Sequence, residues 1–168
     1  VQNTNSEAIT LDDLDFYMDA GTNQSYQLWY NATSITGAPG IINAANGWVS
    51  IAGPQNAAPT GTVNGVYPVF TGIGFEIPAN TTYRFVLTGT GTGNFSYYNA
   101  SGAPNSFSLE GINLLVGDNS AGDTGNVGYS GQNPYTTGIT TNPRFFHGAL
   151  SFNSSTILCE SEREEVTA

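Results

Sequence analysis

The sequence predicts an all-β fold, an antiparallel β-sandwich of jelly-roll type, with an immunoglobulin-like sandwich as the alternative strand order. Short runs alternate apolar and polar residues with the two-residue period of a strand, and no window shows the period of a capped helix. The chain of 168 residues contains 21 Gly and 8 Pro, which separate those runs with turns. Hydrophobic residues make up 39% of the chain, which is enough for one well-packed domain.

The N-terminal region contains the clearest strand pattern. In residues 8–18 the apolar positions change parity after Leu11, and a β-bulge at Asp12 and Asp13 would bring both sets of apolar side chains to one face. A second strand is expected at 25–31, where apolar and polar residues alternate. We therefore predict that the first strand is bent.

Turn-forming residues divide the remainder of the chain into further strands. We expect 67–77 and 81–88 to pair as a hairpin joined by a tight turn. The segments 53–64 and 117–142 are expected to be loops because they are rich in Pro, Gly and Asn. The Thr-Gly repeat of 87–94 is interpreted as a turn. The other expected strands are 48–52, 95–99, 109–116 and 144–152.

The charge of the chain argues against nucleic acid as a partner. It has 13 acidic residues against three basic ones and a formal net charge of −10, whereas phosphate binding needs a basic patch. Only 10% of the residues are charged, and Asn, Thr, Ser and Gly supply the polarity, which is typical of extracellular all-β proteins. No apolar run approaches the ~18 residues of a membrane span. We predict a secreted protein without membrane insertion.

The chain is interpreted as one module of a longer protein. Residues 1–157 are predicted to form the sandwich, and the acidic residues 158–168 to begin a linker to a neighbouring module. Cys159 is the only cysteine, so we expect no internal disulfide and a thiol that is free or pairs outside the chain. No positive segment followed by an apolar one stands at Val1, as a signal peptide would require.

No pattern of catalytic residues is present. His147 is the only histidine, and it alternates with apolar neighbours in a predicted strand, which is typical of a structural side chain. No GxSxG nucleophile motif occurs. Glu76 and Glu110 are the only acids inside predicted mid-chain strands, so a glycoside hydrolase or lyase would have to use them. We predict that the protein is not an enzyme.

Calcium is the one cofactor that the sequence suggests, because it needs only oxygen ligands. The alternative for the first of two acidic clusters is a strand edge that deters pairing, and for the second it is a polar turn. The two candidate sites are Asp12, Asp13, Asp15 and Asp19 around the bend of the first strand, and Asp118, Asn119 and Asp123 in a glycine-rich loop. Neither has EF-hand spacing.

Aromatic side chains suggest glycan binding, because sugars stack on exposed rings. Trp29 shares the parity of Gln27, so we expect it to point away from the main core. Tyr129 and Tyr135 lie in a long loop, where functional aromatic residues are common. The alternative is that such rings cover the open ends of the sandwich, and we expect Trp48 and Tyr83 to be core residues.

Three segments of the chain occur in an order that is characteristic of a known family. They are ITLDDLDFYMDAG followed by YQLWYN, then FEIPANTTYRFVLTG, then RFFHGALSF. Together they resemble a β-sandwich module of large secreted surface proteins of the Bacteroidetes. That family usually has glycine where this chain has Asn80, a change that is tolerable where the φ angle is positive.

The tail CESEREEVTA resembles the Cys-x-Ser-x-Arg-x-x-Val-Thr-Ala border that often closes such modules in gliding adhesins. Glu162 stands where that border usually has proline. The resemblance implies a repetitive adhesin of gliding motility exported by type IX secretion, or an accessory module of a cell-surface enzyme. It transfers no catalytic residue. The matching residues are Cys159, Ser161, Arg163, Val166, Thr167 and Ala168.

Two functions of different classes follow from the residues and the resemblance together. The leading hypothesis is a non-catalytic structural and adhesive module of a large cell-surface adhesin. The alternative is a carbohydrate-binding module attached to a secreted polysaccharide-degrading enzyme, with extracellular polysaccharide or surface glycans as partners. In the adhesin, force along the chain would load the strands nearest its two ends, 8–18 and 144–152, and those strands would resist best if they lay side by side.

Overall fold

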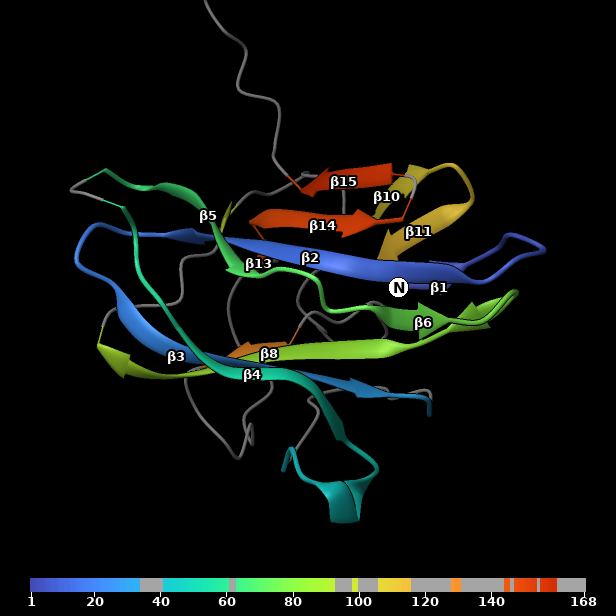
Figure 1. Ribbon diagram of the computed structural model, residues 1–168, viewed down its shortest axis with the longest axis horizontal. Helices are drawn as coiled ribbons and strands as arrows, with labels where there is room; N and C mark the ends of the chain where they lie inside the picture. The colour runs from blue at the N-terminus through green and yellow to red at the C-terminus, as the bar shows by residue number, and fades with distance from the viewer. Residues whose placement is uncertain are drawn as a thin grey trace, which may run out of the picture.

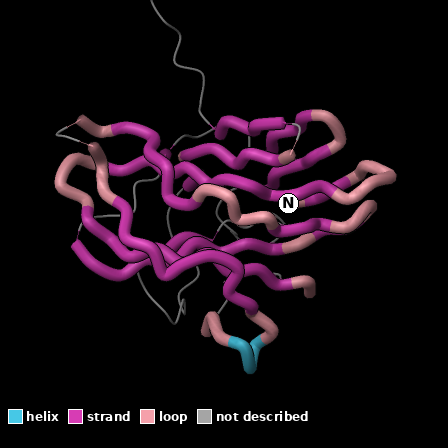
Figure 2. The backbone as a smooth tube through the Cα atoms, in the orientation of Figure 1, coloured by secondary structure: helices cyan, strands magenta, loops and turns pink. Residues whose placement is uncertain are grey.

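The computed structural model describes residues 1–33, 41–60, 63–92, 98–99, 106–115, 128–130, 144–145, 147–153 and 155–159. They form an all-β structure of packed sheets (Figures 1 and 2), and the prediction of a β-sandwich is confirmed. The helical element of these residues is a single 3₁₀ turn, η1 (Ala44–Asn46). The strands are β1 (Gln2–Asn3), β2 (Ile9–Met18), β3 (Asn23–Asn31), β4 (Val49–Ala57), β5 (Gly65–Phe70), β6 (Phe75–Ile77), β7 (Thr81–Thr82), β8 (Arg84–Thr92), β9 (Tyr98–Asn99), β10 (Ser106–Leu109), β11 (Ile112–Leu115), β12 (Gly128–Ser130), β13 (Arg144–Phe145), β14 (Gly148–Phe152) and β15 (Ser155–Cys159).

Two sheets form the main layers of the sandwich. The first sheet has the order β15-β14-β2-β5, with β6 pairing to β2, and the second has the order β12-β8-β3-β4. In Figure 1 the first sheet is the upper layer and the second is the lower one. A third, smaller sheet has the order β10-β11-β1-β7, and β13 pairs with β9. The pair β12–β8 is parallel, whereas the other pairings between described strands are antiparallel.

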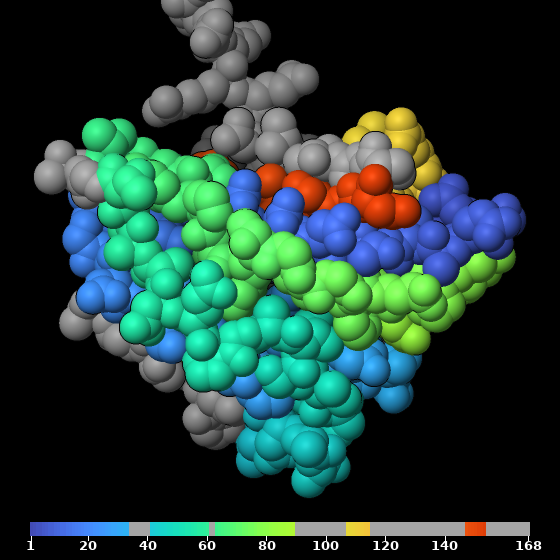
Figure 3. Space-filling view, viewed as in Figure 1, coloured from blue at the N-terminus to red at the C-terminus, as the bar shows by residue number. Residues whose placement is uncertain are grey.

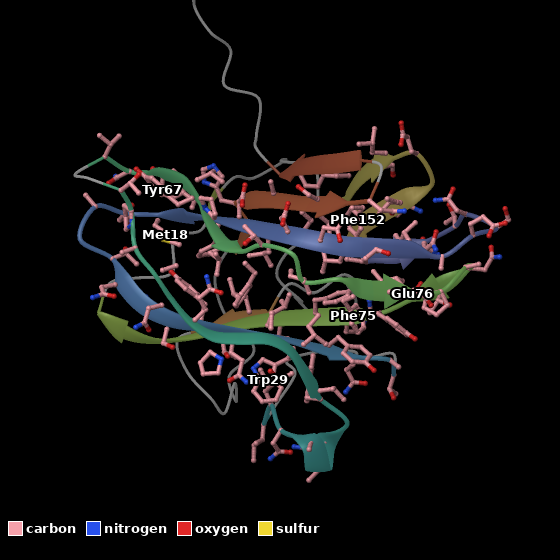
Figure 4. The ribbon with its side chains drawn as sticks, in the orientation of Figure 1. Met18, Trp29, Tyr67, Phe75, Glu76 and Phe152 are labelled. Atoms are coloured by element: carbon pink, nitrogen blue, oxygen red, sulfur yellow. The ribbon has the colours of Figure 1, made fainter. Side chains whose placement is uncertain are left out.

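One apolar core fills the space between the layers. Figure 4 shows two of its side chains, Met18 and Phe75, between the first and second sheets. Phe75 contacts Tyr30 with ring centroids 4.5 Å apart and Phe85 at 5.8 Å. Burial of this apolar surface is the main stabilising term of the fold. The buried members are Val1, Ile9, Leu11, Leu14, Phe16, Met18, Tyr26, Leu28, Val69, Phe70, Ile77, Leu87, Ile112, Leu114, Leu150 and Phe152.

The predicted bulge of the first strand is confirmed. Leu11 and Leu14 are both buried although they differ in parity. On β14, Ser151 lies opposite Asp13 and Phe152 opposite Leu11, so the ladder passes over Asp12. One extra residue in β2 therefore brings both apolar sets to the core.

The predicted hairpin of 67–77 with 81–88 is wrong. The first segment is two strands, β5 and β6, and both pair with β2. The second is β7, which pairs with β1, and β8, which pairs with β3. The chain therefore crosses between sheets where the hairpin turn was expected. Asn80 at this crossing has φ of 52°, in the left-handed region that asparagine tolerates better than most residues.

Asn3 binds the chain at this crossing, because β1 pairs with β7 and the Asn3 side chain lies against the end of β6. Its side-chain amide donates to the carbonyl oxygens of Ile77 and Pro78, at 3.1 Å each. The N-terminal segment thus pairs with β7, while β6 pairs with β2. The break between β5 and β6 is bound to the bulge of β2, since the N–H of Gly72 donates to Asp13 Oδ1 at 2.9 Å.

Two predicted loop or turn segments are strands. β4 continues through Gly53 and Pro54 to Ala57, although 53–64 was expected to be a loop. β4 is an edge strand. Edge strands tolerate proline, because the N–H that proline lacks can face away from the neighbouring strand. The Thr-Gly segment is also strand as far as Thr92, because β8 pairs with β3 along its whole length.

The C-terminal strands also differ from the prediction. The segment 109–116 contains the second half of a hairpin, β10–β11, whose turn residues Glu110 and Gly111 have φ of 47° and 77°. The segment 144–152 is divided into β13 and β14. β15 was not expected, and it runs two residues beyond the predicted module boundary at 157. Cys159 therefore lies in the first sheet, opposite Gly148, and not in a linker.

Candidate functional site

The outer face of the second sheet carries a tryptophan among uncharged polar side chains. Alternation along β3 directs Tyr26 and Leu28 into the main core and leaves Gln27 and Trp29 on the other face. In the ladders Trp29 lies opposite Val86 of β8 and Ser50 of β4, and Gln27 lies opposite Thr88. We call Gln27, Trp29, Ser50 and Thr88 the Trp29 face. The prediction that Trp29 points away from the main core is confirmed.

Hydrogen bonds link the four residues of the Trp29 face through side chains and one backbone carbonyl oxygen. Trp29 Nε1 donates to Thr88 Oγ1 at 3.1 Å, and Thr88 Oγ1 donates to the carbonyl oxygen of Gln27 at 3.3 Å. Gln27 Nε2 donates to Ser50 Oγ at 2.8 Å. The network spans three neighbouring strands and holds the indole in one orientation.

A small apolar cluster supports the indole from behind. Trp29 packs against Ile42, Trp48 and Val86, which are 2–3% exposed. Figure 4 shows Trp29 beside β4 on the side away from the first sheet. Trp48 was expected in the core and is buried, but in this separate cluster and not in the main one.

The segment that contributes Ile42 and Trp48 is held to β3 by asparagines. Asn43 caps the η1 turn through its side-chain oxygen, which accepts the N–H of Asn46 at 3.0 Å. Asn31 Nδ2 donates to the carbonyl oxygen of Asn46 at 3.1 Å. Figure 3 shows residues 41–57, in teal, on the surface of the molecule.

The outer face of the first sheet is acidic. Asp13 and Asp15 of β2 are half-buried beside β14 and β5. Burial raises the pKa of the Asp15 carboxyl, and the negative charge of Asp13 raises it further. Two residues on, the ring of Tyr17 stacks on His147, with centroids 4.3 Å apart and planes 12° apart.

The calcium prediction at the first strand gains no support from this geometry. Within the described part of the chain, no three His, Cys, Asp or Glu side chains form a group that could hold a metal ion. Asp13 Oδ1 accepts the N–H of Gly72, and the backbone of Asp19 forms a turn in which its carbonyl oxygen accepts the N–H of Thr22. The second predicted calcium site, Asp118, Asn119 and Asp123, lies outside the described residues and stays a prediction.

The two predicted loop tyrosines are only partly covered by the structure. Tyr129 belongs to β12, in register with Leu87 of β8, and not to a loop. Tyr135 lies outside the described residues. Of the three predicted glycan-binding rings, the structure therefore gives side-chain surroundings for Trp29.

The residues considered for catalysis lie apart in the topology. His147 stacks on Tyr17 at the first sheet. Glu76 is exposed in β6. Glu110 was expected inside a strand, but it is exposed in the β10–β11 turn. These placements do not favour the glycoside hydrolase hypothesis.

Three residues of the Trp29 face were not identified from the sequence, namely Gln27, Ser50 and Thr88. Their common signal is parity: Gln27 is two residues from Trp29, and Thr88 is two residues from Val86, so each pair shares one face of its strand. The alignment of the three strands, which brings them together, has no such local signal.

Comparisons with known proteins add no relative to this picture. No protein-family model, no curated protein and no solved structure matches the chain. Over the described ranges, none of the structure forms a helix with the length and apolar character needed to cross a membrane.

Proposed function

We propose that this domain is a non-catalytic, load-bearing module of a large repetitive adhesin that is secreted to the outer cell surface. Its partners are the neighbouring modules of the same polypeptide. The resemblance of its segments and tail to gliding-adhesin modules supports this role. The arrangement of β2, β14 and β15 is the observation that carries it.

β2 and β15 lie on the two sides of β14, and both run antiparallel to it. Phe152 of β14 lies between Leu11 and Ser155, and Gly148 lies between Phe16 and Cys159. The beginning of β2 and the end of β15 therefore lie at opposite ends of one three-stranded ladder. Figure 1 shows the three strands side by side.

Force applied through this ladder acts in shear. When the beginning of β2 and the end of β15 are pulled apart along the strands, the hydrogen bonds of both ladders carry the load together. In an unzipping geometry the bonds would break one after another. A shear geometry therefore needs more force for the same number of hydrogen bonds.

Asn3 anchors the entry to β2. It is 0% exposed, and its Nδ2 donates to the carbonyl oxygens of Glu7, Ile77 and Pro78 at 2.9 to 3.1 Å. Its Oδ1 accepts the N–H of Asn5 at 3.0 Å. The chain before β2 is thus bound to the core edge before the load reaches the ladder.

Single-molecule pulling in two geometries tests the proposal. The first geometry pulls through the two chain ends and shears the ladder. The second pulls through residue 20 and the C-terminal end, because Ala20 follows β2 at the same end of the ladder as Cys159. We expect unfolding through the chain ends to need several times the force.

The second geometry is the matched control, since the same ladders break in both. Equal unfolding forces in the two geometries, or a lower force through the chain ends, would contradict the load-bearing role.

A further inference from the structure

The strands that carry the Trp29 face are almost free of charge. β3, β4 and β8 together contain one charged residue, Arg84, at the beginning of β8. Arg84 lies opposite Asn31, two rungs beyond the rung of Trp29 and Val86, and therefore has the same parity as Val86. The chain as a whole carries 13 acidic residues, and β2 of the other sheet contains three of them. Apart from Arg84 at the beginning of β8, these strands give the outer face of the second sheet no charge, so the surroundings of Trp29 suit a ligand without negative charge.

The indole of Trp29 is rigid before any ligand arrives. Ile42, Trp48 and Val86 support it, and its N–H is bonded to Thr88. A ring that is already fixed loses little conformational entropy on binding. A fixed, half-buried indole offers an apolar surface for the C–H face of a sugar ring.

Polar groups for sugar hydroxyls stand next to the indole. A primary amide has two N–H donors and an oxygen with two lone pairs, so Gln27 keeps bonding capacity beyond its bond to Ser50. The hydroxyl of Ser50 has a donor and two acceptor positions. Residues two apart on one face of a strand are ~7 Å apart and neighbouring strands ~5 Å apart, so the Trp29 face has the size of one or two sugar units.

We propose that the Trp29 face binds a neutral polysaccharide, with the ring of Trp29 stacking on a sugar unit and Gln27 and Ser50 bonding to its hydroxyls. This inference does not depend on the load-bearing role, which involves the other sheet. The absence of charge from β3 and β4 favours a neutral chain over an anionic one, because an anionic chain would also be repelled by the net charge of −10.

Affinity electrophoresis in native gels tests the proposal. The gels contain hydroxyethyl cellulose, amylopectin or galactomannan as neutral polysaccharides, and polygalacturonate as the anionic one. We expect at least one neutral polysaccharide to retard the protein and polygalacturonate to leave it unretarded. Trp29→Ala should abolish the retardation, and Gln27→Ala should weaken the apparent affinity about tenfold, as the loss of one or two hydrogen bonds implies.

Further variants control for folding and for position. Trp29→Ala removes packing from the Ile42 cluster and can therefore destabilise the protein. Gln27→Ala and Ser50→Ala change polar surface groups only, so they test the face in a protein whose melting temperature stays near that of wild type. Tyr17→Ala removes an aromatic ring from the acidic face of the first sheet and should keep the wild-type retardation.

Three results would overturn the proposal. They are a folded wild-type protein that none of the three neutral polysaccharides retards, equal retardation by polygalacturonate, and retardation that persists in both Trp29→Ala and Gln27→Ala. None of these results would change the pulling forces expected for the first sheet, so the two proposals fail separately.

Discussion

The two sheets share one core but differ on their outer faces. β2 of the first sheet presents Asp13 and Asp15, and the polar contacts of this sheet tie β2 to its neighbours. The second sheet presents the Trp29 face, where uncharged groups bond to one another across three strands. Packing dictates the inner faces of both sheets, whereas it leaves the outer faces free to differ. The strand order of the first sheet and the outer face of the second are the features behind our two proposals, load bearing for the first sheet and ligand binding for the second.

Among substitutions in the second sheet, we expect Gly53→Ala to lower the free energy of unfolding most. Its φ is +88°, and a Cβ there would contact the backbone carbonyl oxygen of Tyr26 in β3. Gly53→Ala should therefore separate β4 from β3 and lower the free energy of unfolding by about 3 kcal/mol or more. Urea denaturation measures the change.

Gly21→Ala is the control for Gly53→Ala. Gly21 has a similar φ of +82° but nothing within 4 Å of the added Cβ, so its cost should be about 1 kcal/mol, from backbone strain alone. Equal losses at the two positions would show that the close approach of β4 to β3 is not what constrains Gly53.

Asn3→Asp should destabilise the entry to β2 in the first sheet. In Asn3→Asp the buried amide donor is replaced by a carboxylate that faces the carbonyl oxygens of Ile77 and Pro78. We expect a loss of about 3 kcal/mol at pH 7. Burial raises the pKa of the new carboxyl above its unfolded value, so the folded state binds the extra proton and the loss should become smaller as the pH falls towards 4.

Asn153→Asp is the matched control for Asn3→Asp. Asn153 is exposed, and its Oδ1 accepts the N–H of Thr10 at 3.2 Å, which a carboxylate oxygen does equally well. Its urea midpoint should change little at either pH. A loss like that of Asn3→Asp would mean that added negative charge, and not the lost donor, destabilises the fold.

The smallest expected effect concerns the acidic face of the first sheet. The folded-state pKa of Asp15 is raised, first by burial and then by Asp13. The folded protein therefore holds this proton more tightly than the unfolded chain, and stability falls as the pH rises from about 3.8, the ordinary pKa of an aspartate carboxyl, through the folded pKa. Asp15→Asn should raise the Tm by about 1 °C at pH 7 and leave it unchanged at pH 3.

Glu76→Gln is the control for Asp15→Asn, because it removes the same charge from the exposed side of neighbouring β6. If both variants raise the Tm equally at pH 7, relief of the net negative charge of the chain explains the gain, and the local environment of Asp15 does not.

Much of the local structure was predictable from neighbouring residues. The change of parity at Leu11 and Leu14 predicted the bulge of β2, and the shared parity of Trp29 and Gln27 placed the indole outside the main core. Each of these predictions depends on a few consecutive residues, whose side chains alternate along a strand for steric reasons.

The errors concern the choice of strand partners. The segments 67–77 and 81–88 have the pattern of a hairpin, yet β5 and β6 pair with β2, whereas β7 pairs with β1 and β8 with β3. The candidate site was missed for the same reason. Gln27, Ser50 and Thr88 are far apart along the chain, and only the register of three strands brings their side chains together.

The amino-acid sequence by itself determined the class of the fold, the bend in β2 and the side of β3 on which Trp29 lies, because the period of apolar residues depends on local backbone geometry. Only the tertiary structure decided which strands are neighbours, that β14 lies between β2 and β15, and that an uncharged network surrounds Trp29. Strand pairing is settled by the packing of the whole core, because any exposed strand edge can accept many partners and burial of the apolar faces selects among them.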